Sequence, residues 1–273
     1  MSAIDALFRK LRGEGRKALM PFVTAGDPDL DFTAQLLRLL ADRGAALCEL
    51  GIPYSDPIAD GPVIQASYTR ALGRKLRLAE ILAMLGRLTP TLPVPLVTMV
   101  SYAIIYRQGL ENYVRRAKAA GVAGAIVPDL PLEESGPLAE LCRREDFSLV
   151  QLVTPTTPRD RTLAIAERTS GFIYYVSVAG ITGERKELPP ELIENVAWLR
   201  RQTPLPVCIG FGISRPEHVR MLAPVADGLI VGSAIVRRVA EAAAQPRGAV
   251  LDQVGDYLSE LLAAMPAGLR PST

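Results

Sequence analysis

Histidine is almost absent from this sequence of 273 residues, and its scarcity excludes several kinds of catalytic site. The one histidine, His218, lies in "SRPEHVRML", a segment with the pattern of a helix and not of a strand end. A catalytic triad would need a histidine beside a nucleophile, and a zinc site commonly uses several. We therefore expect His218 to be a surface or helix-packing residue and not a general base.

Lysine and cysteine are also sparse. An aldolase that forms an imine needs a lysine at the end of a strand, but none of the five lysines lies there: Lys10, Lys17, Lys75, Lys118 and Lys186. The three cysteines are far apart and form no metal-binding pair, which argues against a disulfide scaffold and a zinc site: Cys48, Cys142 and Cys208. We expect no metal, and we interpret the cysteines as small packing residues.

The sequence also lacks a strong excess of one charge, and it lacks long hydrophobic runs. The 31 basic and 29 acidic residues give a net charge of +2, and nucleic-acid binding needs a clustered basic surface. No apolar run approaches the roughly 18 residues of a membrane span, and the opening "MSAIDALFRKLRGEGRK" lacks the apolar core of a signal peptide. We expect a cytoplasmic protein that binds neither nucleic acid nor membrane.

The sequence does contain one alternation, repeated along its whole length. Amphipathic stretches separate eight short apolar runs typical of strands buried on both faces, at 18–26, 46–54, 94–102, 124–131, 148–155, 171–180, 206–214 and 227–235. This predicts a single (β/α)8 TIM-barrel domain over residues 1–273, with an extra N-terminal helix "AIDALFRKLRG" and another, "LAEILAMLGRL", after the second unit. A doubly wound open sheet is the structural alternative. Helix-capping candidates are Asp31, Ser135 and Ser214.

Glycine-rich turns follow three consecutive expected strands. They read "GITG" (180–183), "GFGIS" (210–214) and "GSA" (232–234), and Ser214 and Ser233 add hydroxyl donors. Glycine lets backbone N–H groups approach an anion closely, and barrel phosphate sites are built after the last strands at a helix start. The turns therefore predict a site for a small phosphorylated metabolite.

Carboxylates are the remaining candidates for chemistry. Glu49 stands near the end of the second expected strand, Asp60 lies in the loop beyond it, and Asp129 ends the fourth. Alternation along the strand turns Glu49 away from Cys48 and Leu50. Inside a barrel, apolar walls would favour its protonated form and make it a usable acid and base. The alternatives are a structural carboxylate at Glu49 and simple turn chemistry at Asp60.

These segments resemble a known family. "ELGIPYSDPIADGPVIQ" closely resembles the signature of the tryptophan synthase alpha chain, and other segments fall in that family's order and spacing over residues 15 to 265: "PFVTAGDPDL", "VPDLPLEES", "YYVSVAGITG", "CIGFGIS" and "IVGSAIV". The resemblance implies a lyase of tryptophan biosynthesis that reversibly cleaves indole-3-glycerol phosphate to indole and glyceraldehyde 3-phosphate. It also implies a beta-chain partner in an α2β2 complex. That partner carries pyridoxal phosphate (PLP), so no cofactor is expected in this chain.

The resemblance also implies a role for particular residues. Glu49 would be the acid and base, and Asp60 would hydrogen-bond the indole N–H and stabilise its charge. The residues around the indole would be Phe22, Tyr102, Ile126, Val127, Tyr174, Thr182 and Phe211. The phosphate would be held by Gly183, Gly212, Gly232 and Ser233, and the beta chain would be met at Pro53 and Asp56.

Two segments depart from the family pattern, and three other functions stay open. The chain reads "YAII" at 102–105 where the family commonly reads "YNPI", and "ERKELPP" after "GITG" has its own charge pattern. A phosphosugar isomerase or an indole-glycerol-phosphate synthase could use the same barrel, although the synthase would want lysines at strand ends. A barrel that only binds and activates a partner is the non-enzymatic alternative.

Overall fold

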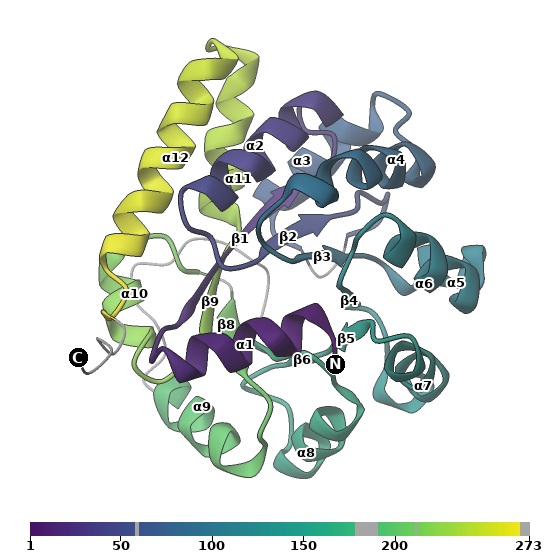
Figure 1. Ribbon diagram of the computed structural model, residues 1–273, viewed down its shortest axis with the longest axis vertical. Helices are drawn as coiled ribbons and strands as arrows, with labels where there is room; N and C mark the ends of the chain where they lie inside the picture. The colour runs from purple at the N-terminus through teal and green to yellow at the C-terminus, as the bar shows by residue number, and fades with distance from the viewer. Residues whose placement is uncertain (58–59, 178–190, 211, 268–273) are drawn as a thin grey trace.

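The computed structural model describes residues 1–57, 60–177, 191–210 and 212–267, and it contains a parallel barrel surrounded by helices (Figure 1). Within the described residues the sheet runs in the order β5-β4-β3-β2-β1-β9-β8-β7-β6. Its strands are β1 Ala18–Thr24, β2 Cys48–Gly51, β3 Leu96–Met99, β4 Gly124–Ile126, β5 Ser148–Val150, β6 Leu152–Val153, β7 Ile173–Val176, β8 Val207–Gly210 and β9 Gly228–Val231. Sequential parallel neighbours confirm the barrel and exclude the doubly wound order.

The barrel closes through one strand that is divided in two. β5 pairs with β4, and β6 pairs with β7, yet only Gln151 separates β5 from β6. The two short strands therefore form the two halves of the fifth expected strand, which the sequence predicted as one run. The closing pair between first and last strands is β1 with β9, where Ala18 lies opposite Gly228.

Helices cover the outside of the barrel. They are α1 Ala3–Gly13, α2 Leu30–Asp42, α3 Pro62–Leu72, α4 Leu78–Leu88, α5 Tyr102–Gln108, α6 Leu110–Ala119, α7 Gly136–Arg144, α8 Arg159–Arg168, α9 Glu191–Gln202, α10 Pro216–Leu222, α11 Ser233–Ala240 and α12 Arg247–Ala263. Single 3₁₀ turns lie at Thr89–Thr91, Leu132–Glu134 and Glu241–Ala243. Both added helices, α1 and α4, have the bounds of the segments that predicted them. No helix in these described ranges is long and apolar enough to cross a membrane.

The helix starts correct two of the expected caps. α2 is capped two residues earlier than expected, because Asp29 and not Asp31 accepts the N–H of Phe32 at 2.9 Å. α10 begins after Arg215 and not after Ser214. Ser135 does stand at the start of α7, as expected.

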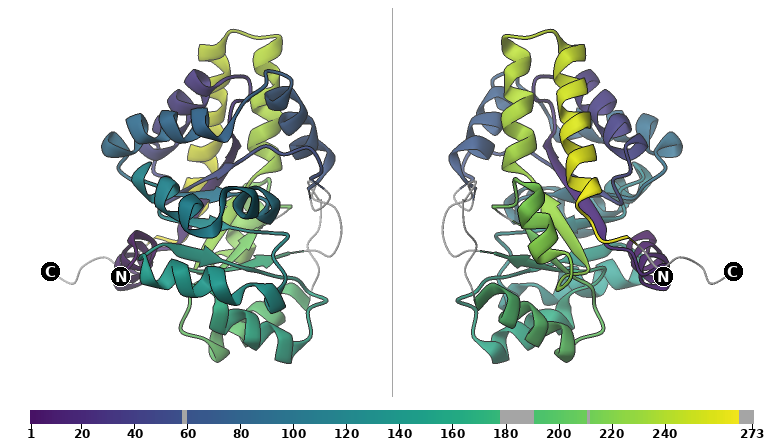
Figure 2. Two further views of the ribbon diagram at one scale, coloured as in Figure 1. Left: turned by 90° about the vertical axis from the view of Figure 1, so that its right-hand side faces the viewer. Right: turned by 90° about the vertical axis from the view of Figure 1, so that its left-hand side faces the viewer.

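Two apolar clusters divide the core. One lies between the strands and the helices, and it includes Cys48 and Leu50 of β2. The other fills the barrel and is sealed by α1, whose Phe8 meets Phe172 with ring centroids 5.8 Å apart. α1 lies at the end where the strands begin (Figure 2), so the opposite end, where the strands finish, is left for a site.

Candidate active site

Glu49 points into the barrel from the middle of β2. It lies level with Phe22 of β1 and Val97 of β3, and both of these belong to the interior cluster. Its neighbours Cys48 and Leu50 face the helices, as alternation predicts. Only 1% of Glu49 is exposed, so the carboxyl group lies within an apolar interior with almost no access to water.

The surroundings of Glu49 favour its neutral form. Its Oε1 atom has no hydrogen-bond partner among the described residues. Burial first, and then the negative charge of Asp60, raises the pKa of Glu49 to about 8. A carboxylic acid with this pKa is protonated at neutral pH and can both give and regain a proton there.

Asp60 lies beyond the end of β2, immediately before α3. Its backbone N–H donates to the carbonyl of Pro57 at 3.0 Å, and Nε2 of Gln65 donates to the Asp60 carbonyl at 2.7 Å. The residue is buried, and burial raises the pKa of its carboxyl to about 6. Near neutral pH, Asp60 is therefore mainly ionised while Glu49 is mainly protonated, so the two carboxyls are prepared for different tasks.

Aromatic rings pack against glycines beside Glu49. A Cβ on Gly51 would lie 2.5 Å from the ring of Phe22 and 2.8 Å from Oη of Tyr68. A Cβ on Gly210 would lie 2.2 Å from Oη of Tyr174. Because real Cβ atoms do not approach so closely, these glycines are required by the rings. Phe22 and Tyr174 thus both lie in the barrel interior.

Tyr68 is a residue that sequence reasoning missed. It comes from α3, and its hydroxyl is buried without a hydrogen-bond partner in the described part of the chain. Its pKa is raised well above the ordinary value by burial first and then by the charges of Asp60, Tyr54 and Glu49. The ring of Tyr54 lies 5.7 Å away from that of Tyr68. Helical spacing predicts only that Tyr68 is a core residue, because nothing in the pattern reveals where a hydroxyl points.

The structure describes only part of the expected phosphate site, which we call the phosphate cradle. Gly212 follows β8 with φ of +77°, and Gly232 precedes Ser233, the first residue of α11. The first N–H groups of a helix have no partner within the helix and favour an anion. Thr182, Gly183 and Phe211, together with the "GITG" turn, lie outside the described residues.

The residues expected at the ends of β3 and β4 lie in different surroundings. Ile126 belongs to the interior cluster, whereas Val127 packs in the helix-facing one, because side chains alternate along an extended chain. Tyr102 lies partly buried on α5 against the same outer cluster. Asp129 accepts from Oγ of Ser101 and from the N–H of Tyr102, both at 2.7 Å, so this third carboxylate joins the two strand ends.

The two residues expected at a partner surface differ in exposure. Asp56 is exposed and accepts from Oγ of Ser55 at 2.6 Å, while Pro53 is buried in the chain by itself. His218 is buried on α10, which makes it a helix-packing residue. In the described ranges, no group of three or more His, Cys, Asp or Glu side chains could hold a metal.

The fold and the buried carboxyls at the strand ends define a (β/α)8-barrel enzyme. The family model of the tryptophan synthase alpha chain matches residues 8–263. A tryptophan synthase alpha chain of Rhodopirellula baltica is 56% identical over 277 residues, covering 98% of this chain and 100% of the relative. The chain belongs to the tryptophan synthase alpha chain family, which is a family of lyases.

Solved structures agree with this assignment. The alpha subunit of Legionella pneumophila superposes with a TM-score of 0.87 at 34% identity, covering 97% of this chain and 98% of that one. A structure of the tryptophan synthase α2β2 complex of Pyrococcus furiosus matches with a TM-score of 0.84 at 38% identity, covering 91% and 99%.

Proposed function

We propose that this chain is the alpha subunit of a tryptophan synthase and reversibly cleaves indole-3-glycerol phosphate to indole and glyceraldehyde 3-phosphate. One observation carries the proposal at the level of residues. Glu49 is a buried acid with an unpartnered Oε1 in the described structure and a pKa raised to about 8, and Asp60 is close enough to raise it. This is a preparation for proton transfer at neutral pH.

The chemistry follows from indole itself. Protonation of C3 places positive charge on the ring nitrogen, and the bond between C3 and the side chain breaks as the side-chain hydroxyl loses its proton. Glu49 donates the proton to C3, and the carboxylate that it becomes accepts the hydroxyl proton. Asp60, with a pKa of about 6, is negatively charged and accepts a hydrogen bond from the ring N–H. No proton is gained or lost in the whole reaction.

The binding site is proposed in two parts. Phe22, Ile126 and Tyr174 form the buried apolar side for indole, and Tyr102, Val127, Thr182 and Phe211 stay predictions for that side. Gly212, Gly232 and Ser233, with Gly183, hold the phosphate through backbone N–H groups and the start of α11. The phosphate thus anchors the substrate at one end while the carboxyls act at the other.

The partner is the tryptophan synthase beta chain in an α2β2 complex. Asp56 is exposed at the end of the barrel where the strands finish, so the loop that carries Asp60 also offers a surface to the beta chain. We assign PLP to that partner and no cofactor to this chain, because the proton chemistry above needs none. We also propose a cytoplasmic location.

One experiment tests the function. The purified chain is incubated with indole-3-glycerol phosphate, with and without a beta chain, and released indole is measured. Indole release that Glu49→Gln abolishes supports the proposal. If the chain with its partner releases no indole, a barrel that only activates its partner becomes the better description.

A further inference from the structure

Both peptide groups around Ser214 are held by side chains from outside the barrel. The N–H of Ser214 donates to Nδ1 of His218 at 3.3 Å, and the carbonyl of Ser214 accepts from the Tyr257 hydroxyl at 3.1 Å. His218 comes from α10 and Tyr257 from α12, and both side chains are buried. Ser214 stands two residues after Gly212, in the same turn of the proposed phosphate cradle.

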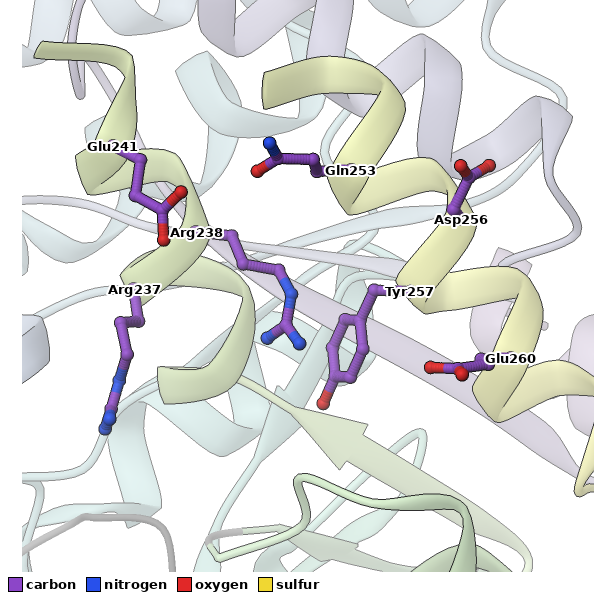
Figure 3. Close-up of a pocket in the computed structure, with 7 residues that line it drawn as sticks. All are labelled: Arg237, Arg238, Glu241, Gln253, Asp256, Tyr257 and Glu260. Carbon is purple, nitrogen blue, oxygen red and sulfur yellow. The ribbon is translucent and has the colours of Figure 1, made fainter. Parts of the chain in front are cut away.

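The other half of the cradle is tied to the same tyrosine. The Arg238 guanidinium stacks over the ring of Tyr257 at 3.6 Å from its centroid, between α11 and α12 (Figure 3). Nη1 of Arg238 also donates to the carbonyl of Ala234 at 2.8 Å, in the first turn of α11 beside Gly232 and Ser233. Through Arg238 and Tyr257, the two cradle segments are connected behind the site.

A backbone cradle needs such support, because a phosphate is bound only when several N–H groups point at one place. Gly212 adopts φ of +77°, and glycine restricts its own backbone less than any other residue does. If the backbone becomes ordered only when the ligand binds, the lost conformational entropy lowers the affinity. Hydrogen bonds from packed helices that order the backbone beforehand avoid this loss. The contacts to Ser214 supply this restriction without any side chain reaching the ligand.

We propose that Tyr257 and His218 are positioning residues for phosphate binding and act by fixing the two peptide groups of Ser214. We call this pair of hydrogen bonds the clamp. Arg238 couples the clamp to the start of α11. The inference rests on the proposed function, because it takes the phosphate of the substrate as the anion. In this proposal His218, the one histidine of the chain, has a role that involves no proton transfer.

Tyr257→Phe tests the clamp most directly. It removes the hydroxyl that holds Ser214 but keeps the ring on which Arg238 stacks. The residue also borders a groove of about 640 Å³ between α11 and α12. Loss of one neutral hydrogen bond should weaken glyceraldehyde 3-phosphate binding and raise KM for indole-3-glycerol phosphate about three- to tenfold. The kcat in the complex with the beta chain and the Kd for indole should change by less than about twofold, because only binding of the remote phosphate is lost.

Tyr113→Phe is the matched control. Tyr113 is buried and its hydroxyl bonds to Oγ1 of Thr98 at 3.0 Å, on the helix-facing side of the barrel. The control therefore loses the same atom and one hydrogen bond but touches neither cradle segment. It should bind glyceraldehyde 3-phosphate as the wild type does. Equal weakening in both variants would indicate general loosening of the fold and would overturn the clamp.

His218 gives a second, independent arm. The side-chain oxygen of asparagine is attached to Cγ, as Nδ1 is in histidine, so His218→Asn keeps an acceptor for Ser214 and His218→Ala does not. We expect His218→Ala to weaken glyceraldehyde 3-phosphate binding by a similar factor and His218→Asn to restore most of it. Unchanged binding in Tyr257→Phe and His218→Ala would overturn the clamp and leave the function intact. A wild-type chain that binds no glyceraldehyde 3-phosphate would overturn both.

Discussion

Replacing Glu49 by glutamine should make the chain more stable, and increasingly so as the pH rises. The pKa of Glu49 is about 8 in the folded chain and 4.5 ordinarily, because burial disfavours the carboxylate. The folded chain therefore binds the proton more tightly than the unfolded chain, and stability falls as pH rises from about 4.5 to about 8. Glutamine has the shape of the protonated acid and cannot ionise. At about 1.4 kcal/mol per pH unit, the gain from Glu49→Gln should grow by on the order of 3–4 kcal/mol between about pH 5 and about pH 8.

Urea unfolding of both proteins at each pH measures this gain. The free energy of unfolding should decline for the wild type and remain flatter for Glu49→Gln, with equal m-values in the two proteins. Asp60 titrates in both proteins, so its contribution largely cancels in the difference. If the difference between the two proteins were the same at both pH values, Glu49 would not be a buried acid with a raised pKa, and the chemistry derived from it would fail.

The remaining predictions concern activity and binding. Glu49→Gln and Asp60→Asn should each lower turnover of indole-3-glycerol phosphate by about 10²–10⁴-fold; near-normal indole release in either would refute its assigned role. The wild-type kcat/KM should be bell-shaped, rising near pH 6 as Asp60 ionises and falling near pH 8 as Glu49 loses its proton, as assayed by initial rates across that range. Gly212→Asp should sharply weaken glyceraldehyde 3-phosphate binding and leave indole binding nearly unchanged, because it brings a like charge to the anion site. Calorimetry with both ligands measures this, and an equal loss of affinity for both ligands would indicate misfolding. Beta-chain binding should accelerate single-turnover cleavage, and identical single-turnover rates with and without it would show that the partner only removes product.

Much of the fold could be predicted because buried parallel strands are apolar throughout. The eight apolar runs each contain an observed strand, but the runs extend past the strand ends, since apolar residues continue into the loops that border the site. Because these strands are apolar on both faces, the sequence does not show which side chains face the barrel interior. Ile126 and Val127 are both apolar and buried, so their pattern could not tell which faces the barrel interior. Gln151 is a single polar residue in an apolar run, and the sequence could not tell that it divides this run into two short strands.

The carboxyls could be predicted because they are exceptions to the apolar pattern. Glu49 stands out inside a buried run, and its expected direction is confirmed by the outward packing of Cys48 and Leu50. The supporting residues could not be found in this way. Tyr68 and His218 lie on helices among ordinary core positions, and a helical pattern does not reveal what a buried polar group on a helix faces. Tyr257 bonds to Ser214 from 43 residues further along the chain, and no local pattern encodes that contact.

The separation of the two carboxyls between a strand and a loop has a consequence for control. Glu49 is fixed by the pairing of β2 with both neighbours, so its burial changes little unless the barrel opens. Asp60 lies outside the strands, and its charge is one of the two causes that raise the pKa of Glu49. Movement of the loop that carries Asp60 therefore changes the proton affinity of Glu49 without moving Glu49 itself. Because exposed Asp56 belongs to this same loop, we expect a beta chain that binds there to act on both the proposed charge beside the indole nitrogen and the strength of the acid.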